Sequence, residues 1–320
     1  MARLGICKYL LSLAVVLFVS VHIARAQCSE ETIKQMEAIF IQNFTQNEAM
    51  APMCLHSAFH DCWNGCNGAL FLPEEIDRPE NAGLPPLKPL LMPFTSQFPC
   101  ISIADLINSC AVTALKFLGG PSVPVYYGRL DRGVPDPPGL IPEPTMSLSA
   151  LIGAFNAIGF TKENVVTLSG AHSVGVCHGI PMCPGHNNTF GNHYYKELIE
   201  GDFEGKLHTD IELLEDNTMR SLVQQYANDQ QQFFNDFSEV FGKYISRIHC
   251  NQTSTGPCPL DDIGVPTSAA PSPQSAVPSF SEPSFGPPSG PSFPTFDGEP
   301  SAPSSFSPFG SSSGPEFFPI

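Results

Sequence analysis

Apolar residues recur at helical spacing through most of residues 28–250, and strand-like alternation is scarce. The clearest example is the segment 147–160, whose apolar positions are Leu148, Leu151, Ile152, Phe155 and Ile158. A longer apolar stripe runs through 221–248, and the segments 50–62 and 101–120 are shorter helical candidates. The pattern therefore predicts an all-α domain.

Both ends of the chain depart from this pattern. Residues 1–26 combine a basic start, a short apolar run and Ala24-Arg25-Ala26, which together are typical of a secretory signal peptide. The run is short for a membrane span and an acidic segment follows it, so we expect a secreted, extracellular protein with no membrane span. Residues 259–320 are rich in Pro, Ser, Gly and Phe. They predict either a disordered tail or a Phe-bearing segment that binds an unknown partner, and the folded domain is placed at 27–258.

Charge and cysteine content narrow the class of protein. The chain has 31 acidic and 15 basic residues and a formal net charge of −16, which argues against binding to nucleic acids or anionic membranes. Of the 11 cysteines, Cys7 lies in the signal segment, and the ten others predict disulfides in an oxidising compartment. N-glycosylation sequons that begin at Asn43, Asn187 and Asn251 are consistent with this route.

Two histidines of the segment 50–62 are candidates for chemistry. His56 and His60 lie one helical turn apart and therefore share a face, while Asp61 points elsewhere. Such a pair can bind zinc, serve a structural role, or act as an acid–base pair above a cofactor. A hydrolytic zinc helix would carry a glutamate directly after the first histidine, but Ser57 stands there and no third ligand is evident. The residues alone leave these alternatives open.

A third histidine, His172, follows an apolar run and Ser169-Gly170-Ala171, small residues that we expect to admit a bulky flat group. Together, "FHDC" (59–62) and "VVTLSGAHSVGVCHG" (165–179) resemble the distal and proximal segments of the plant secretory haem peroxidases, within the plant, fungal and bacterial superfamily. Further segments follow in the family's order: "ISIADL", "LGGPSVPVYYGRLDR", "GLIPEPTMSLSALIGAFNAIGF", "FGNHYYKEL" and "LHTDIELL". The resemblance implies a helical fold that holds haem b, with hydrogen peroxide and small aromatic reductants as substrates.

The resemblance also implies a role for each matching residue. His172 is the expected axial ligand of the haem iron, and Asp210 is the expected acceptor for its other ring proton, although Asp210 also fits an ordinary helix cap. His60 is the expected acid–base catalyst, oriented by Asn81, with Glu75 as the partner of that amide.

Other expected roles are structural. Phe59 is the expected aromatic wall beside the haem, Pro142 is expected to shape substrate access, and Asp105 with Arg129 is an expected buried ion pair. The expected disulfides are Cys62–Cys66, Cys28–Cys100 and Cys177–Cys183. Three pairings stay open for Cys54, Cys110, Cys250 and Cys258.

His56 is the main departure from the family, which has an arginine four residues before the distal histidine. A permanent charge there stabilises the departing oxygen. A histidine titrates near neutrality and shares the pocket with His60, so mutual repulsion should lower both pKa values. We expect slower activation of peroxide, improving in mild acid if His56 becomes protonated. The alternative is a haem-binding, catalytically weak homologue with an extracellular structural or adhesive role.

The calcium sites of the family are also altered. Asp61 is retained on the distal side, but Asn67 stands at another ligand position. On the proximal side Ser173 is retained, but Gly191 and Cys183 stand where acids are expected. Calcium prefers several carboxylate oxygens, so we expect at most a weak calcium site.

Overall fold

The computed structural model describes residues 28–177, 179–249 and 257–258. The expected signal peptide, the tail, Asn251 and the pairing of Cys250 fall outside the described residues and stay predictions. Within these ranges, no helix combines the length and the apolar character needed to cross a membrane.

Helices make up most of the described chain, which confirms the all-α prediction. The first half contains α2 (Glu30–Gln46), α3 (Met50–Cys62), η1 (Ala69–Phe71), α4 (Pro73–Ile76), η2 (Pro79–Asn81), η3 (Pro85–Leu87), α5 (Lys88–Gln97) and α6 (Ile103–Phe117). The second half contains α7 (Leu148–Ala157), α8 (Lys162–Ser169), η4 (Gly170–Ser173), α9 (His193–Glu200), α10 (His208–Glu212), α11 (Asn217–Asn228) and α12 (Gln230–Ile245). The strands of the described chain form two antiparallel pairs, β1 (Val176–Cys177) with β2 (Ile180–Pro181) and β3 (Ile248–His249) with β4 (Pro257–Cys258).

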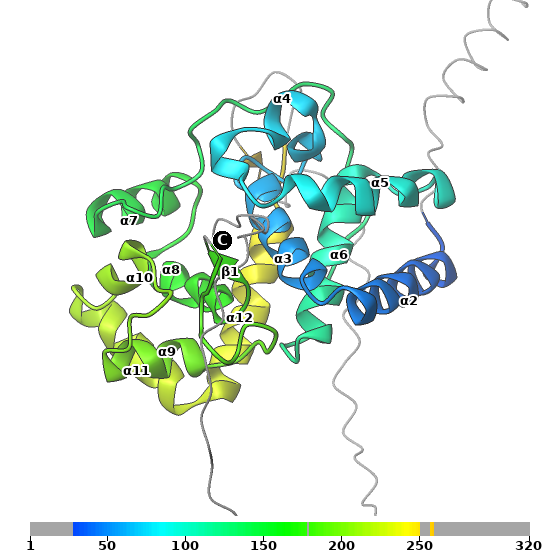
Figure 1. Cartoon of the computed structure of the whole chain (residues 1–320). Helices are drawn as coiled ribbons and strands as arrows, with labels where there is room; N and C mark the ends of the chain where they lie inside the picture. Colours follow the sequence, from blue (N-terminus) through cyan, green and yellow to red (C-terminus); the bar gives the residue numbers. More distant parts are fainter. Residues whose placement is uncertain (1–27, 178, 250–256, 259–320) are drawn as a thin grey trace, which may run out of the picture. The chain divides into compact units, whose positions relative to one another are not determined.

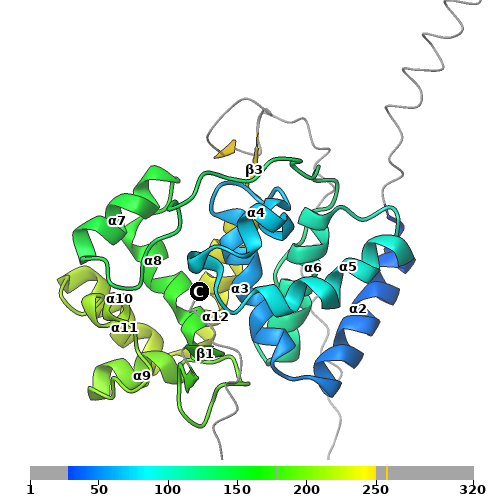
Figure 2. The ribbon, with the colours of Figure 1, turned by 45° about the horizontal axis from the view of Figure 1, so that its top comes forward.

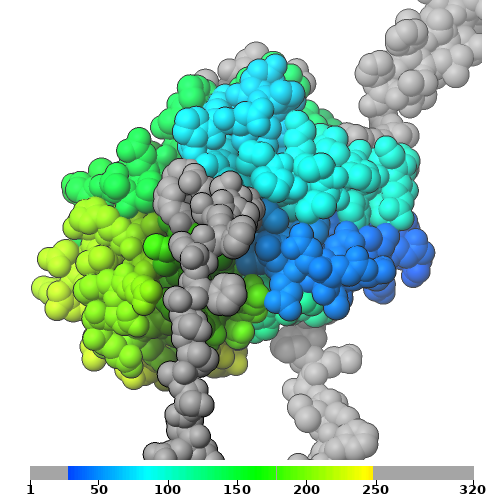
Figure 3. All heavy atoms as spheres, in the orientation of Figure 1, coloured from blue at the N-terminus to red at the C-terminus, as the bar shows by residue number. Residues whose placement is uncertain are grey.

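The two halves of the sequence lie on opposite sides of the domain. Helices α2, α5 and α6 gather around α3 on one side, and α7 to α11 gather on the other (Figures 1 and 2). The same division is visible on the molecular surface, where the blue and cyan atoms of the first half adjoin the green and yellow atoms of the second (Figure 3). Helix α12 packs against both α8 and α3 and so joins the two halves.

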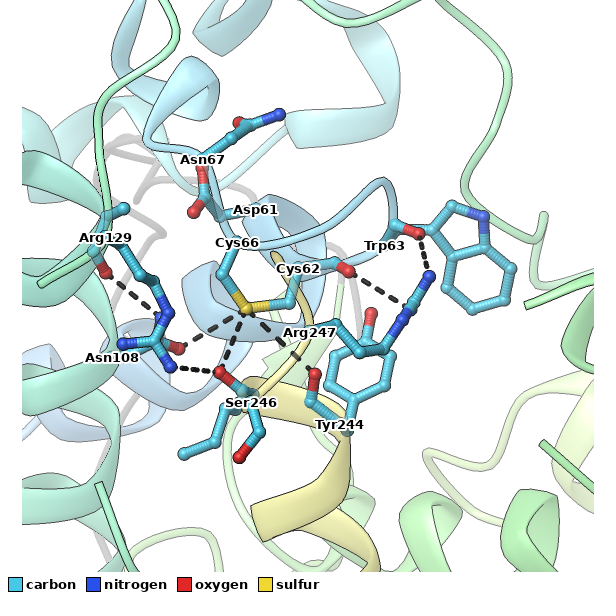
Figure 4. The surroundings of a disulfide bond; sticks show 12 residues. Asp61, Cys62, Trp63, Cys66, Asn67, Asn108, Arg129, Tyr244, Ser246 and Arg247 are labelled. Carbon is cyan, nitrogen blue, oxygen red and sulfur yellow. Dashed lines mark hydrogen bonds between the residues drawn. A yellow bond between two sulfur atoms is a disulfide. The ribbon is translucent and has the colours of Figure 1, made fainter. Parts of the chain in front are cut away.

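The C-terminal end of α3 is held by side chains from the end of α12 and from the segment just after it. The Tyr244 hydroxyl donates to the Phe59 carbonyl at 2.6 Å. Arg247 donates to the carbonyls of Cys62 and Trp63 at 3.2 and 3.1 Å (Figure 4). The last carbonyls of a helix lack partners within the helix, and the positive charge of the guanidinium faces the negative end of its dipole. These contacts fix the direction of the helix that carries both distal histidines.

A buried ion pair fastens α6 to the same region. Arg129 donates to Asp105 at 2.8 Å, and its guanidinium also donates to the main-chain carbonyls of Tyr126 and Ile245. A buried charge is tolerated when it is paired and hydrogen-bonded. The expected ion pair is therefore present, and it connects three separate segments.

The apolar stripe in 221–248 is divided between two helices. The chain leaves helical geometry at Asp229, where φ is −134° and ψ is 93°. Its carboxylate accepts the Gln232 N–H at 2.9 Å and so begins α12 as an N-cap.

Three disulfides join described residues: Cys28–Cys100, Cys54–Cys110 and Cys62–Cys66. The expected Cys177–Cys183 bond is wrong, because both cysteines are free and buried. The β1–β2 hairpin pairs Cys177 with Ile180, whereas the Cys183 thiol points inward and donates to the His172 carbonyl at 3.4 Å.

Packing of the protein core, and not access for a flat group, requires a small residue at position 170. A Cβ on this residue would lie 2.4 Å from the Tyr195 hydroxyl and 2.5 Å from the Phe233 ring. The space beside Gly170 is therefore filled by the protein's own aromatic core rather than left open for a flat group.

We expect Gly170→Ala to lower the free energy of unfolding by about 1–3 kcal/mol, because the added methyl group overpacks this core. Denaturant unfolding of the purified protein measures the change. Gly153→Ala in α7 is the matched control: its Cβ would meet nothing within 4 Å. In a helix interior that change should stabilise by about 0.5–1 kcal/mol. Equal effects of the two substitutions would contradict the packing argument.

Candidate active site

A cavity of about 300 Å³ lies between the two halves of the domain. Phe59 and His60 of α3 line it from one half, and Leu168, Ser169 and His172 line it from the other. Its described lining is mostly apolar and includes two carboxylates, Glu80 and Glu143, but no lysine or arginine.

The ring orientation of His60 is set by a chain of hydrogen bonds. Asn81 donates from Nδ2 to the Glu75 carbonyl at 2.8 Å, and its Oδ1 lies 2.7 Å from His60 Nδ1. An amide oxygen only accepts, so Nδ1 of His60 carries the proton and the lone pair of the neutral ring is on Nε2. Glu75 thus acts through its main chain and not through its carboxylate, which instead accepts the Asp136 N–H at 2.6 Å.

His56 contacts the catalytic candidate directly. Its Nε2 lies 2.8 Å from Nε2 of His60, and the two rings are perpendicular at 89°. Because His60 Nε2 carries a lone pair, the hydrogen atom of this bond belongs to His56. The nitrogen of His60 that would receive a proton from a substrate is therefore already accepting one hydrogen bond.

The charge state of His56 follows from its surroundings. The side chain is buried, and burial, followed by the neighbouring rings of His60 and His172, lowers its pKa well below the usual 6.5. The pKa of His56 is lowered as expected, with burial as the larger cause. Neutral His56 should persist in mild acid, so acid activation through its protonation is not supported.

On the opposite wall, Asp210 binds the third histidine. His172 Nδ1 lies 2.7 Å from Asp210 Oδ1, so Nδ1 is the donor and the lone pair of the ring is on Nε2. The same oxygen accepts the Tyr194 hydroxyl at 2.6 Å, while Oδ2 accepts the Leu207 N–H at 2.8 Å. Asp210 therefore both caps α10 and orients His172.

Comparisons with known proteins agree with this geometry. A family model described as Peroxidase matches residues 36–229. This chain belongs to the peroxidase family. It is 35% identical to the cytosolic L-ascorbate peroxidase 1 of Oryza sativa subsp. japonica over 210 residues, which cover 60% of this chain and 84% of that protein. It is 34% identical to the cytosolic L-ascorbate peroxidase 2 of Arabidopsis thaliana over 205 residues, or 59% of this chain and 82% of that protein.

The name of a fungal relative includes a cofactor. A protein of Cryptococcus neoformans named as a heme-binding peroxidase is 36% identical over 244 residues, which cover 68% of this chain and 76% of that protein. The chain is thus a haem-dependent peroxidase of the plant, fungal and bacterial superfamily, and hydrogen peroxide is its oxidant.

The residues of the cavity fit haem. The cavity is lined mainly by apolar side chains, and it is bounded by an imidazole whose second nitrogen is bonded to a carboxylate. Carboxylate-bound histidine is a common axial ligand of haem iron, and the carboxylate strengthens the ligand. His172 is the described residue that suits this position.

Phe59 and Pro142 both line the cavity, as expected. The Phe59 ring stacks on Tyr244, with ring centroids 5.2 Å apart and planes 16° apart. The zinc alternative lacks support, because no three His, Cys, Asp or Glu side chains of the described chain converge on a metal position.

The residues expected to bind calcium are engaged in internal hydrogen bonds. Asp61 accepts the N–H groups of Gly68 and Leu70, and burial raises the pKa of its carboxyl to about 7. Ser173 accepts the Gly191 N–H at 3.4 Å through its hydroxyl. The weak calcium site stays a prediction.

Tyr194 belongs to the site, although its position in the sequence does not indicate this. This residue lies in the segment "FGNHYYKEL" that matched the family, but nothing in the local pattern indicates that its hydroxyl meets Asp210. The packing of α9 against η4, which is a long-range contact, brings the Tyr194 hydroxyl to Asp210.

We expect His56→Leu to increase the association rate constant of hydrogen cyanide with the ferric haem. Cyanide must give up its proton before it binds, and in the wild type His60 can accept that proton only by losing its bond to His56. A hydrogen bond of this kind contributes about 0.5–1.5 kcal/mol, which corresponds to an increase of about two- to tenfold. Stopped-flow absorbance measures the rate.

His60→Leu is the control and should slow cyanide binding, because it removes the base itself. An unchanged or slower rate in His56→Leu would contradict the assignment of the hydrogen atom to His56.

Proposed function

We propose that the protein is a secreted haem peroxidase that uses hydrogen peroxide to oxidise small phenolic donors in single-electron steps. One observation carries the proposal: His60 and His172 line the same cavity, and each donates a hydrogen bond from Nδ1 to a fixed acceptor. Both rings therefore present the nitrogen that can bind iron or accept a proton, which is what peroxide chemistry on haem requires.

The proximal residues have a holding role. When bound, haem supplies an iron that peroxide can oxidise and that organic donors can reduce. His172 holds this iron through Nε2, and Asp210 accepts its Nδ1 proton, so the ring becomes a stronger electron donor.

The distal residues move a proton. His60 accepts one proton of hydrogen peroxide at Nε2 and returns it to the departing oxygen. Asn81 keeps the ring in the tautomer that this transfer needs. Neutral His56 offers one N–H where the family arginine offers a permanent charge, so we expect peroxide activation to be slower than with arginine.

The charge of the cavity lining favours an uncharged electron donor. Glu80 and Glu143 line it, and the described lining contains no lysine or arginine. Ascorbate is an anion at neutral pH and is repelled by such a surface, whereas most phenols are neutral. The ascorbate peroxidases among the relatives thus share the reaction with peroxide, and we propose a different reductant here.

Secretion rests on the signal-like segment 1–26, the cysteines and the sequons. Three disulfides among the described residues are consistent with an oxidising compartment. Asn43 and Asn187 are partly exposed, as acceptors of a glycan must be.

A second candidate function is a haem-binding homologue with weak catalysis. The hydrogen bond from His56 to His60 favours it, because this bond occupies the nitrogen that peroxide needs.

The absorption spectrum of the haem-loaded protein, before and after one equivalent of peroxide, tests the proposal. We expect a Soret band that peroxide alters and guaiacol restores with turnover. His60→Leu should lower kcat/KM for peroxide by about 10²–10⁴-fold while the haem stays bound. His208→Ala, an exposed histidine, is the control. A Soret band that peroxide leaves unchanged would favour the weakly catalytic homologue.

We also expect Glu143→Lys to raise kcat/KM for ascorbate relative to guaiacol, because it reverses one charge of the cavity lining. An exposed charge contributes up to about 1 kcal/mol, so the ratio should rise about two- to fivefold. Glu200→Lys, an exposed glutamate of α9, is the matched control for net charge. A similar rise in both variants would show that the net charge, and not the cavity, selects the donor.

A further inference from the structure

A buried lysine and a buried cysteine lie in contact beside the main chain of the proximal histidine. Lys206 Nζ lies 3.4 Å from Cys183 Sγ, and neither side chain is exposed to solvent. Nζ also donates to the Glu197 carboxylate at 2.6 Å and to the Met182 carbonyl at 2.5 Å. A lysine is rarely buried unless it is paired in this way. The amine is therefore held in place, with a sulfur that can be oxidised as one of its neighbours.

The two chain segments that carry these side chains touch at Gly205. A Cβ on Gly205 would lie 2.1 Å from the Pro181 carbonyl oxygen and 3.0 Å from that of Met182. The φ of Gly205, 73°, is also one that other residues rarely adopt. The main chains of 181–183 and 204–206 therefore approach as closely as a glycine allows, and this packing keeps Nζ of Lys206 near Sγ of Cys183.

The two free cysteines have different surroundings. Cys177 lies in β1, where its main chain pairs with Ile180. The Cys183 thiol donates to the His172 carbonyl at 3.4 Å, and its sulfur accepts the hydrogen bond of Lys206. An amine nucleophile is therefore in contact with the sulfur of Cys183.

The site lies one layer beneath the surface. Ile180 is 49% exposed, and residues 201–204 of the loop before Lys206 are exposed as well. Hydrogen peroxide is scarcely larger than water, so local opening of this loop is enough to admit it.

The resting charges make this a slow site. Burial lowers the pKa of Lys206, but the Glu197 carboxylate and the Cys183 sulfur more than offset burial, so this pKa is raised and the amine is a cation. Burial raises the pKa of the Cys183 thiol, and the Lys206 ammonium offsets only part of that rise. The thiolate is the form that attacks peroxide, so we expect oxidation of Cys183 only during sustained excess of peroxide.

We propose that Cys183 and Lys206 are an oxidation site at which hydrogen peroxide creates a covalent sulfur–nitrogen cross-link. In the first step the sulfur of Cys183 attacks peroxide, which gives a sulfenic acid and one water. Glu197 then accepts one proton from the Lys206 ammonium. The neutral Nζ attacks the sulfur, and the hydroxyl group leaves with a second proton of the amine as water. One S–H, one O–O and two N–H bonds are broken, and atoms and charge balance.

The cross-link joins the two segments that fix the proximal side. Cys183 donates to the carbonyl of His172, the expected iron ligand. Leu207 directly follows Lys206 and donates its N–H to Asp210 at 2.8 Å. A covalent bond between positions 183 and 206 therefore ties the segment beside His172 to the segment that carries Asp210, and excess peroxide fastens the residues that hold the haem.

The test treats the full-length, haem-loaded protein with excess hydrogen peroxide and analyses its tryptic peptides by mass spectrometry. We expect the peptides of Cys183 and Lys206 to be joined, with the loss of two hydrogen atoms and no cleavage after Lys206. Dithiothreitol should reverse both changes, because thiols reduce a sulfur–nitrogen bond. Lys206→Arg keeps the charge but removes the amine nucleophile and should abolish the cross-link. Lys196→Arg, at an exposed lysine of α9, is the matched control and should retain it.

A disulfide between Cys177 and Cys183 would remove the same mass from the chain. Cys177→Ser removes this competitor, and we expect the cross-link to Lys206 to form in it as in wild type. The mass readout requires no turnover of an organic donor, so its result is independent of the reductant that we propose.

Thermal unfolding gives a second readout. The cross-link spans 23 positions of sequence and restricts the unfolded chain. Peroxide treatment should therefore raise the Tm of wild type by about 5–10 °C relative to the same sample reduced with dithiothreitol. Lys206→Arg should show no such difference.

Two results in wild type would overturn the proposal. One is a sulfinic acid at Cys183 while trypsin still cleaves after Lys206. The other is a Cys177–Cys183 disulfide in place of the link to Lys206. Both are read from the wild-type peptides, so poor folding of a variant does not leave the question open.

Discussion

The hydrogen bond from His60 to Asn81 determines the chemistry of the distal side. Asn81 is itself fixed by the Glu75 carbonyl of α4. Each group in this series donates to the next, from His56 through His60 and Asn81 to that carbonyl. A main-chain carbonyl can only accept, and each following group must then donate in turn. The tautomers of both rings are therefore set by the backbone of a short helix, and not by the histidines themselves.

The proximal side uses the same logic with a carboxylate. Asp210 divides three donors between its two oxygens: the His172 ring and the Tyr194 hydroxyl on Oδ1, and the Leu207 N–H on Oδ2. The sequence suggests two alternative roles for Asp210, a helix cap and a partner of the histidine ring, and in the structure Asp210 has both. Fixing α10 and fixing His172 are thus a single requirement on the chain, and a second donor on Oδ1 moderates how strongly that oxygen attracts the histidine proton.

Local pattern predicted the helices well and long-range contacts poorly. The predicted segment 50–62 coincides with α3, because apolar spacing depends only on neighbours along the chain. Other features were not predictable from neighbouring residues. The break at Asp229 depends on whether this residue caps a helix or continues it. The free Cys177 and Cys183 and the crowding at Gly170 depend on partners distant in sequence. The family motifs placed the distal and proximal histidines in one site. At position 56, where the family has arginine, they could not predict that His56 lies 2.8 Å from His60.

Replacing an arginine with His56 changes more than a charge. A guanidinium has five N–H donors and a permanent charge, so it can donate one N–H to an imidazole lone pair and still offer its charge and its other donors. His56 has one N–H, and at rest this N–H is engaged with His60 at 2.8 Å. Once His60 takes a proton at Nε2, two N–H groups would face each other across that distance, so the bond must break. Proton transfer to His60 therefore releases the His56 N–H at the step in which a nearby oxygen gains negative charge. The His56 N–H becomes available to that oxygen at this step, whereas an arginine would be available throughout.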